Sequence, residues 1–226
     1  MMTLPKIEHP TFTTVLPSGA KATYRPFTGR EQKVLLFAKE SGDTSDVIRG
    51  LIDVIGACCP GLNPADLTIF DLEFLFLMIR AKSVGSRVEI KVTDDGKQYD
   101  AVVEIDKAMV EAPKATKSPK IEVAPGVIVV LKFPTARDVS NMPKSADEWD
   151  YLAASVSSVT SGEDVTSAAD VSRDELKEWL KTLPLSAVAP MRDFFESKPK
   201  IYLEATYTVG DEVRKKRVSG VGDFFE

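Results

Sequence analysis

The chain has 226 residues, of which 43% are hydrophobic and 28% are charged, the proportions of an ordinary globular protein. Its net charge of −5 gives no overall attraction to nucleic acid or to an anionic membrane, so we expect neither as a partner. Residues 69–79 form the longest apolar stretch, which two acidic residues interrupt and which is shorter than the roughly 20 residues that span a bilayer. Residues 1–10 lack the apolar region of a secretion signal, which predicts folding in a cytoplasm.

The first half of the chain predicts a β-hairpin, three helices and a second β-hairpin. Thr28 and Glu31 have the spacing of a capping box, in which a hydroxyl and a carboxylate satisfy amides at the start of a helix. Apolar residues recur at helical spacing in the second helix, and Asp94-Asp-Gly96 forms a turn between two alternating strands. The expected segments are a hairpin at 11–25, helices at 28–40, 47–58 and 68–82, and a hairpin at 88–105.

The third expected helix contains the apolar run Phe74-Leu-Phe-Leu-Met-Ile79. An apolar surface wider than one helical face predicts burial on all sides. Two arrangements satisfy that requirement: the helix lies at the centre of its own domain, or one of its sides meets another subunit.

Residues 111–120 predict a linker, because two prolines and three lysines occur there without periodicity. The second half then repeats the order of the first with changes. A stretch rich in serine, threonine and aspartate is expected to be irregular, and Ser172 and Glu175 form a further capping box. The expected segments are a hairpin at 121–133, helices from Thr135, at 146–156, after Ser172 and at 188–197, an irregular stretch at 157–170, and hairpin strands at 200–207 and 213–218.

A repeated sequence pattern connects the two halves. Gly19 and Gly126 lie 107 positions apart, as do Thr28 and Thr135, Arg30 and Arg137, and Glu31 and Asp138. A period this long indicates a duplicated unit of domain size, since solenoid repeats run to roughly 50 residues. The expected fold class is therefore α+β, with two related modules from an internal duplication, each a β-hairpin, helices and a β-hairpin. The module boundaries are expected at 1–112 and 113–226.

Catalytic and cofactor-binding equipment is largely missing from this sequence. The single histidine, His9, stands in the N-terminal segment, and the two cysteines, Cys58 and Cys59, are adjacent and expected to be buried on a helix. This inventory is too small for a structural zinc site, and no phosphate-binding or dinucleotide-binding motif is present. We therefore predict a non-enzymatic protein without metal, cofactor or small-molecule substrate. The acidic pairs Asp94-Asp95 and Glu163-Asp164 leave a carboxylate-dependent hydrolase as a formal alternative.

Two features predict contacts with a protein partner. The basic run Arg214-Lys-Lys-Arg217 lies on the last expected strand, where alternate side chains point to opposite faces. Charges divided between two faces suit an exposed strand or an acidic partner better than nucleic acid. The tetrapeptide Asp-Phe-Phe-Glu occurs at 193–196 and again at 223–226, and its second phenylalanine pair either docks on the chain itself or anchors a partner. The candidate partner-binding residues are Phe224, Phe225, Arg214, Lys215, Lys216 and Arg217.

The order of several short motifs resembles the baseplate hub assembly family of contractile-tailed, T-even-type bacteriophages. The motifs are Pro26-Phe-Thr-x-x-Glu31, Leu75-Phe-Leu77, Arg87-Val-Glu-Ile-Lys-Val92, Val127-Ile-Val-Val-Leu-Lys-Phe-Pro-Thr135 and a closing Gly-x-x-Asp-Phe-Phe. The resemblance covers nearly the whole chain. Many members of that family carry a Cys-x-x-Cys knuckle where this chain has Asp94-Asp-Gly96, so the resemblance implies a zinc-free hairpin tip here.

This resemblance implies a structural subunit of the baseplate hub or an assembly factor (chaperone) for it. The implied partners are the hub, the tape-measure protein or neighbouring baseplate proteins. The implied location is the host cytoplasm during assembly and, for a structural subunit, the virion tail baseplate. A peptide-binding adaptor that uses an exposed hairpin edge, outside any phage, is the alternative from another class.

Overall fold

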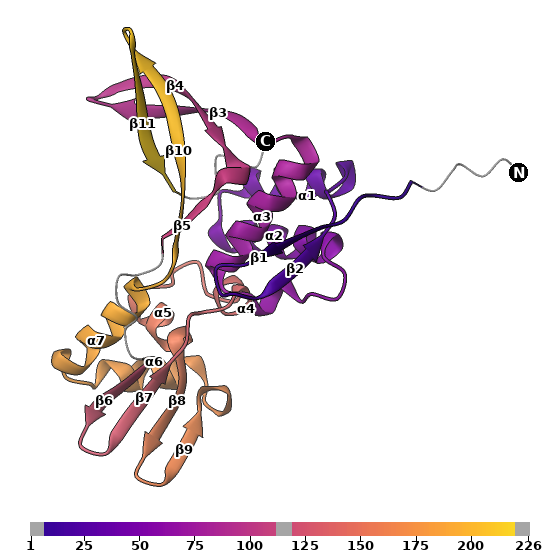
Figure 1. Cartoon of the computed structure of the whole chain (residues 1–226). Helices are drawn as coiled ribbons and strands as arrows, with labels where there is room; N and C mark the ends of the chain where they lie inside the picture. Colours follow the sequence, from indigo (N-terminus) through magenta and orange to yellow (C-terminus); the bar gives the residue numbers. More distant parts are fainter. Residues whose placement is uncertain (1–6, 112–118, 220–226) are drawn as a thin grey trace, which may run out of the picture.

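The computed structural model describes residues 7–111 and 119–219, apart from the side chain of Lys39. Within these ranges the chain forms seven α-helices and eleven β-strands, which confirms the predicted α+β class. Figure 1 shows three parts: a helical body built on α1–α3, long strands above it, and a lower part of strands and helices from the second half. No helix in the described ranges is long and apolar enough to cross a membrane.

The first half follows the predicted order of hairpin, three helices and hairpin. Asp43 caps α2 by accepting hydrogen bonds from the amides of Ser45 and Asp46, and Thr68 caps α3 in the same manner. Local capping therefore fixes where these helices begin. The elements are β1 (Phe12–Val15), β2 (Lys21–Tyr24), α1 (Gly29–Ser41), α2 (Thr44–Cys58), α3 (Ile69–Val84), β3 (Arg87–Asp94), β4 (Lys97–Glu104) and β5 (Met109–Glu111).

The second half places further elements between its two hairpins. Complete capping boxes begin α4, α5 and α6, and the box of α6 is the predicted pair Ser172 and Glu175. The elements are β6 (Lys120–Ala124), β7 (Val127–Leu131), α4 (Ala136–Ser140), α5 (Glu148–Ser155), β8 (Val156–Ser161), β9 (Asp164–Ser167), α6 (Arg173–Lys181), α7 (Leu185–Glu196), β10 (Lys200–Val209) and β11 (Glu212–Val218).

The expectation of an irregular stretch at 157–170 was wrong. Strands β8 and β9 form an antiparallel hairpin there, and a 3₁₀ turn at Ala168–Asp170 follows them. Gly162 makes the tight turn with a φ of 60°, a conformation that glycine adopts without steric cost. Strand β8 also pairs with β7, so tertiary pairing gives this serine-rich and threonine-rich segment its strand structure.

One sheet contains strands from both halves of the chain. Its strand order is β11-β10-β4-β3, and β5 pairs with another part of β10. Antiparallel pairing of β10 with β4 aligns Ala205 with Val103, so the closing hairpin completes the sheet that the first half begins. The module boundary between residues 112 and 113 stays a prediction. The sheet combines strands from both sides of that boundary.

Several local structures recur at the 107-residue spacing. The hairpin turns contain Gly19 and Gly126, which both have positive φ values, 90° and 76°. The Glu31 carboxylate accepts a hydrogen bond from the amide of Thr28, and the Asp138 carboxylate accepts one from the amide of Thr135. Arg25 pairs with Glu31, and Lys132 pairs with Asp138 at the same spacing. This recurrence supports the proposed duplication, which stays a prediction.

Two hydrophobic cores hold the molecule together, and Phe133 connects them. The larger core surrounds α3 and also takes residues from α4, α5 and β10. The smaller core lies between β6–β8 and helices α5–α7. The Phe133 ring stacks on Phe194 at 4.8 Å and meets the edge of Phe70 at 5.5 Å, so one side chain packs against both cores.

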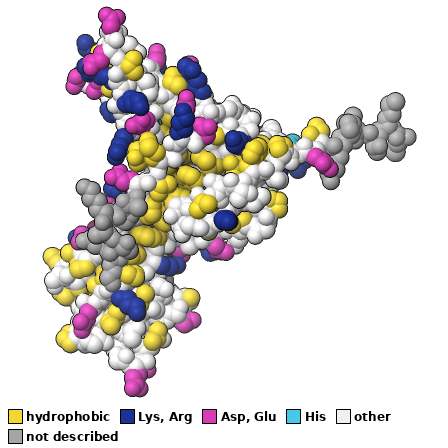
Figure 2. Space-filling view, in the orientation of Figure 1, with side chains coloured by type: hydrophobic (Ala, Val, Ile, Leu, Met, Phe, Trp, Pro, Cys, Tyr) yellow, Lys and Arg dark blue, Asp and Glu magenta, His cyan; other side chains and the backbone are white. Residues whose placement is uncertain are grey.

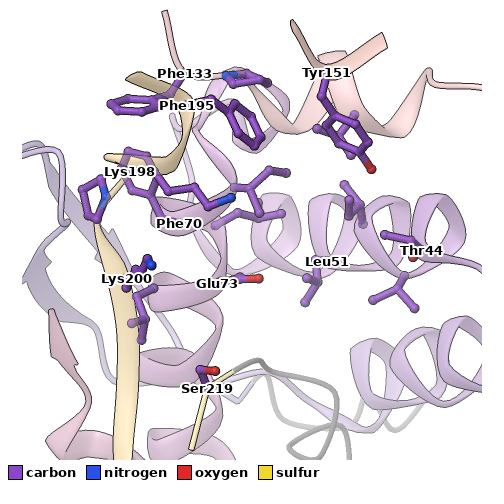
Figure 3. Close-up of a pocket in the computed structure, with 18 residues that line it drawn as sticks. Thr44, Leu51, Phe70, Glu73, Phe133, Tyr151, Phe195, Lys198, Lys200 and Ser219 are labelled. Atoms are coloured by element: carbon purple, nitrogen blue, oxygen red, sulfur yellow. The ribbon is translucent and has the colours of Figure 1, made fainter. Parts of the chain in front are cut away.

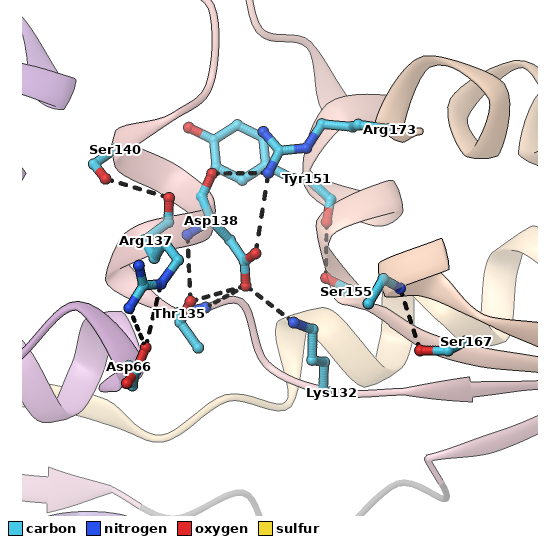
Figure 4. A network of polar contacts seen from close by, with 11 residues as sticks. Asp66, Lys132, Thr135, Arg137, Asp138, Ser140, Tyr151, Ser155, Ser167 and Arg173 are labelled. Atoms are coloured by element: carbon cyan, nitrogen blue, oxygen red, sulfur yellow. Dashed lines mark hydrogen bonds and ion pairs between the residues drawn. The ribbon is translucent and has the colours of Figure 1, made fainter. Parts of the chain in front are cut away.

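Polar contacts add a further connection between the halves, besides the shared sheet and Phe133 (Figure 4). The Arg137 guanidinium donates to the Asp66 carboxylate at 2.7 Å, and the amide of Ala136 donates to the carbonyl of Leu67 at 2.7 Å. Arg173 reaches back from α6 to the carbonyl of Asp138, whose carboxylate is held by Thr135 and Lys132. These contacts fix α4 against the helical body and so fix the space between the two halves.

Candidate partner-binding surfaces

An apolar groove of about 450 Å³ lies between the helical body and the second half of the chain. Helices α2 and α3 form one side, and residues around Phe133, Tyr151 and the segment that connects α7 to β10 form the other (Figure 3). Figure 2 shows apolar surface that continues along this junction between the two parts. We call this feature the apolar groove.

Helical periodicity explains why α2 presents an apolar wall here. Val47, Ile48 and Leu51 recur at the three-residue and four-residue spacing that places side chains on one helical face. Ile48 and Leu51 are buried, whereas Val47 is half-buried and Thr44, one turn earlier, is exposed. The exposure of the lining residues of α2 therefore increases toward the start of the helix.

Aromatic side chains form the opposite wall. The rings of Tyr151 and Phe195 approach to 6.2 Å between centroids, and both are half-buried. Aromatic rings that are partly exposed in a concave site supply large contact areas for a partner at low entropic cost. The chemistry of both walls suits an apolar or aromatic side chain as an occupant.

A few charged groups stand at the edge of the groove. The Lys198 amine lies 4.4 Å from the centroid of the Phe195 ring, a cation–π contact, and Lys200 lines the groove two residues later, at the start of β10. Glu73 contributes the carboxylate in Figure 3. Burial raises the pKa of Glu73, and the positive charge of Lys198 partly opposes that rise. The groove therefore favours a ligand with some negative charge beside its apolar part.

The predicted basic run lies on β11, at the edge of the shared sheet, which we call the charged sheet (β3, β4, β10 and β11). Every residue of the run has a partner within the chain. Arg214 pairs with Asp94 at 3.1 Å and with Glu212 at 2.9 Å. Lys215 pairs with Glu204 at 3.0 Å, and Arg217 pairs with Glu111 at 3.1 Å. Lys216 donates a hydrogen bond to the carbonyl of Thr93. The contacts with Asp94, Thr93 and Glu111 attach the closing hairpin to the first half, whereas those with Glu204 and Glu212 lie within the hairpin itself. A role in partner binding stays a prediction.

Asp94 is the acceptor at which the two hairpins of the charged sheet meet. The Tyr207 hydroxyl donates to its carboxylate at 2.9 Å, and Arg214 donates at 3.1 Å. The hydrogen bond from Tyr207 and the charge of Arg214 lower the pKa of Asp94, which therefore stays ionised at neutral pH. Asp94 is thus a structural acceptor that joins the two hairpins.

Replacing Asp94 with alanine is expected to loosen the hairpin tips without unfolding the protein. The variant removes the acceptor for Tyr207 and Arg214 but leaves the buried side of the sheet intact. Hydrogen exchange should speed up at the amides of the β10–β11 turn, while the exchange of α3 should not change. The neighbouring variant Asp95→Asn is the control, because asparagine tolerates the positive φ of 48° at this position. Equal exchange in both variants would contradict this account.

The remaining candidates for chemistry are the two cysteines, which are buried, and the single histidine, which is exposed. Cys58 and Cys59 are free and buried, and burial raises their pKa values to about 11 and about 12, so neither is a reactive thiolate at neutral pH. His9 is exposed in the extended N-terminal segment. Among the described residues, no group of three histidine, cysteine, aspartate or glutamate side chains is placed to hold a metal ion.

Of the predicted contact residues, the structure brings Arg214, Lys215, Lys216 and Arg217 together on β11, whereas Phe224 and Phe225 lie outside the described residues. Sequence reasoning missed the apolar groove. The apolar face of α2 was visible in the sequence, but it predicted only burial.

The sequence model of one protein family, described as T4 bacteriophage base plate protein, matches residues 9–226. No curated protein and no solved structure matches the chain. The matched range includes both halves of the molecule, the apolar groove and the charged sheet.

Proposed function

The chain belongs to the T4 bacteriophage base plate protein family, and from this membership we propose that it serves the baseplate hub of a contractile tail, as a structural subunit or as an assembly factor. The observation that carries the proposal is the family match over nearly the whole chain. The order of sequence motifs supports the more specific assignment to the hub.

The proposed role is to bridge protein partners. The apolar groove and the charged sheet are separate surfaces with different chemistry, one aromatic and aliphatic and the other rich in ion pairs. Two such surfaces suit two partners, which we propose are the hub, the tape-measure protein or neighbouring baseplate proteins. Phe224, Phe225 and the basic run are the proposed contact residues.

The charges of the basic run support a protein partner over nucleic acid. Glu111, Glu204 and Glu212 each lie within ion-pair distance of the run and compensate much of its charge. Affinity for nucleic acid depends on uncompensated lysine and arginine side chains that displace counterions from phosphates. We also propose a protein without catalytic activity, since the groove walls are mainly apolar and Asp94 is engaged by Tyr207 and Arg214.

Mass spectrometry of purified phage particles separates the two versions of this role. A structural subunit should be found in mature virions at a fixed ratio to other baseplate proteins. An assembly factor should be absent from virions, while deletion of its gene should stop baseplate formation. Normal particles that lack the protein and form without its gene would contradict both versions.

A further inference from the structure

We propose that residues 220–226 occupy the apolar groove of their own chain in the free protein, with Phe224 and Phe225 as the side chains that fill it. This proposal concerns the isolated protein and does not depend on the role at the hub. It assigns an occupant to a surface that the fold leaves open between the helical body and the second half.

The groove has the size and chemistry for two phenylalanine rings. A dry protein cavity of about 150 Å³ is enough to bind benzene. The apolar groove measures about 450 Å³ and offers aliphatic side chains on α2 and aromatic rings on the opposite wall. Two phenyl groups therefore fit with room for the backbone that carries them.

The position of Ser219 brings the segment to the groove. Ser219 is itself one of the residues that line it (Figure 3). Phe224 follows five residues later, and five extended residues span about 17 Å. This reach exceeds the roughly 10–12 Å diameter of a helix with its side chains, so the phenylalanine pair can cross from one wall to the other.

The charges of the segment complement those of the groove. Asp223 and Glu226 flank the phenylalanine pair in the sequence. Lys198 and Lys200 line the same groove as Ser219, and Figure 3 shows Lys200 between Lys198 and Ser219. Acidic residues beside two aromatic rings thus meet two lysines, which outnumber the one carboxyl group among the described residues that line the groove, Glu73.

The same tetrapeptide already packs at this place in the fold. Residues 193–196 are also Asp-Phe-Phe-Glu and form the end of α7. Phe194 is buried against Phe133, and Phe195 lines the groove with the Lys198 amine over its ring. A second copy of these residues would find aromatic and lysine partners of the same kind.

A short tether makes an intramolecular occupant effective even when its intrinsic affinity is weak. Effective concentrations for short flexible connections are in the millimolar range. A segment that binds at about 100 μM as a free peptide would therefore fill its own groove about nine-tenths of the time. A baseplate partner that takes the groove would also release the phenylalanine pair for contacts of its own.

The test measures binding of a fluorescent peptide, Ser-Gly-Val-Gly-Asp-Phe-Phe-Glu, to the full chain by anisotropy. The double variant F224S/F225S should bind the peptide about tenfold more tightly than the unaltered chain, because its groove is vacant. Adding Val47→Glu to the double variant places a carboxylate on the apolar wall and should weaken binding by about tenfold or more.

Two further variants keep the test decisive. Thr44→Glu adds a negative charge at the exposed first residue of α2, where the helix dipole favours it, so folding is preserved while peptide binding should weaken. Phe37→Glu changes an exposed phenylalanine outside the groove and should leave binding unchanged. Equal peptide affinity in the unaltered chain and in F224S/F225S would overturn the proposal. So would a dimer that F224S/F225S converts to a monomer, because the occupant would then come from a second copy.

Discussion

Replacing Phe76 with alanine is expected to lower the free energy of unfolding by about 3–5 kcal/mol, the range for a fully buried phenylalanine. The Phe76 side chain has 0% exposure, and its neighbours Leu75 and Leu77 have 0% and 1%. Three consecutive buried residues point in different directions around α3, so packed side chains surround this helix. The cavity left by the ring therefore has little freedom to collapse.

Chemical denaturation followed by circular dichroism measures this loss, after the far-ultraviolet spectrum has shown that the variant folds. Phe37→Ala is the matched control, because Phe37 is 61% exposed on α1 and its loss should change stability by no more than about 0.5 kcal/mol. Similar losses in the two variants would mean that α3 is not the centre of the core.

This burial favours the first of the two arrangements that the sequence allowed for α3, the centre of its own domain. The run from Phe74 to Ile79 predicted a helix buried on all sides, and eight of the sixteen residues of α3 are buried within the single chain. The helix starts and the tight turns were also predictable, since a capping box or an aspartate–glycine turn depends on residues within a few positions of each other. Ser172 with Glu175 behaves as its spacing predicted, and Thr135 with Asp138 repeats the contact of Thr28 with Glu31.

Long-range pairing was not predictable by the same reasoning. Whether β10 joins β4 depends on contacts between residues about 100 positions apart, such as Ala205 and Val103. The β8–β9 hairpin was missed for a related reason. Its residues, serine and threonine mixed with valine, do not distinguish a loop from an exposed strand until β7 supplies a partner.

The apolar groove illustrates how far sequence patterns reach toward a binding site. Val47 and Leu51 predicted a buried helical face, and Phe133 belongs to a motif that predicted only family resemblance. Their convergence requires α4 to be fixed against the helical body by Arg137 and Asp66. A groove is a vacancy left by tertiary packing, so no local pattern encodes it.

Replacing Glu31 with glutamine is expected to cost about 2–3 kcal/mol at pH 7. Burial alone would raise the pKa of this carboxyl, whose side chain is 8% exposed. Hydrogen bonds from Thr28 and the ion pair with Arg25 outweigh that effect and lower the pKa from 4.5 to about 2. The amide of Thr28 donates at 2.7 Å and Arg25 donates at 3.0 Å, so glutamine would leave Arg25 without its charged partner.

The lowered pKa also fixes the direction of the pH dependence. The folded state holds the ionised carboxylate more tightly than the unfolded chain does, so this stabilisation is fully present above pH 4.5. It is lost as the pH falls from 4.5 to about 2, where the folded protein must also bind the proton. Glutamine does not titrate, so the variant should lack this part of the acid destabilisation.

Denaturation curves at pH 7, 4.5, 3 and 2 for both proteins isolate the contribution of Glu31, because the other carboxyl groups titrate equally in each. The stability difference between the two proteins should shrink as the pH falls and nearly vanish at about pH 2. The matched control is Asp138→Asn at the corresponding place in the second half. Asp138 also has a lowered pKa, but its partner Lys132 is 43% exposed, compared with 23% for Arg25, so the loss should be smaller. A stability difference between the unaltered protein and Glu31→Gln that stays constant with pH would contradict this account. It would mean that Glu31 stabilises the fold through its shape and not through its charge.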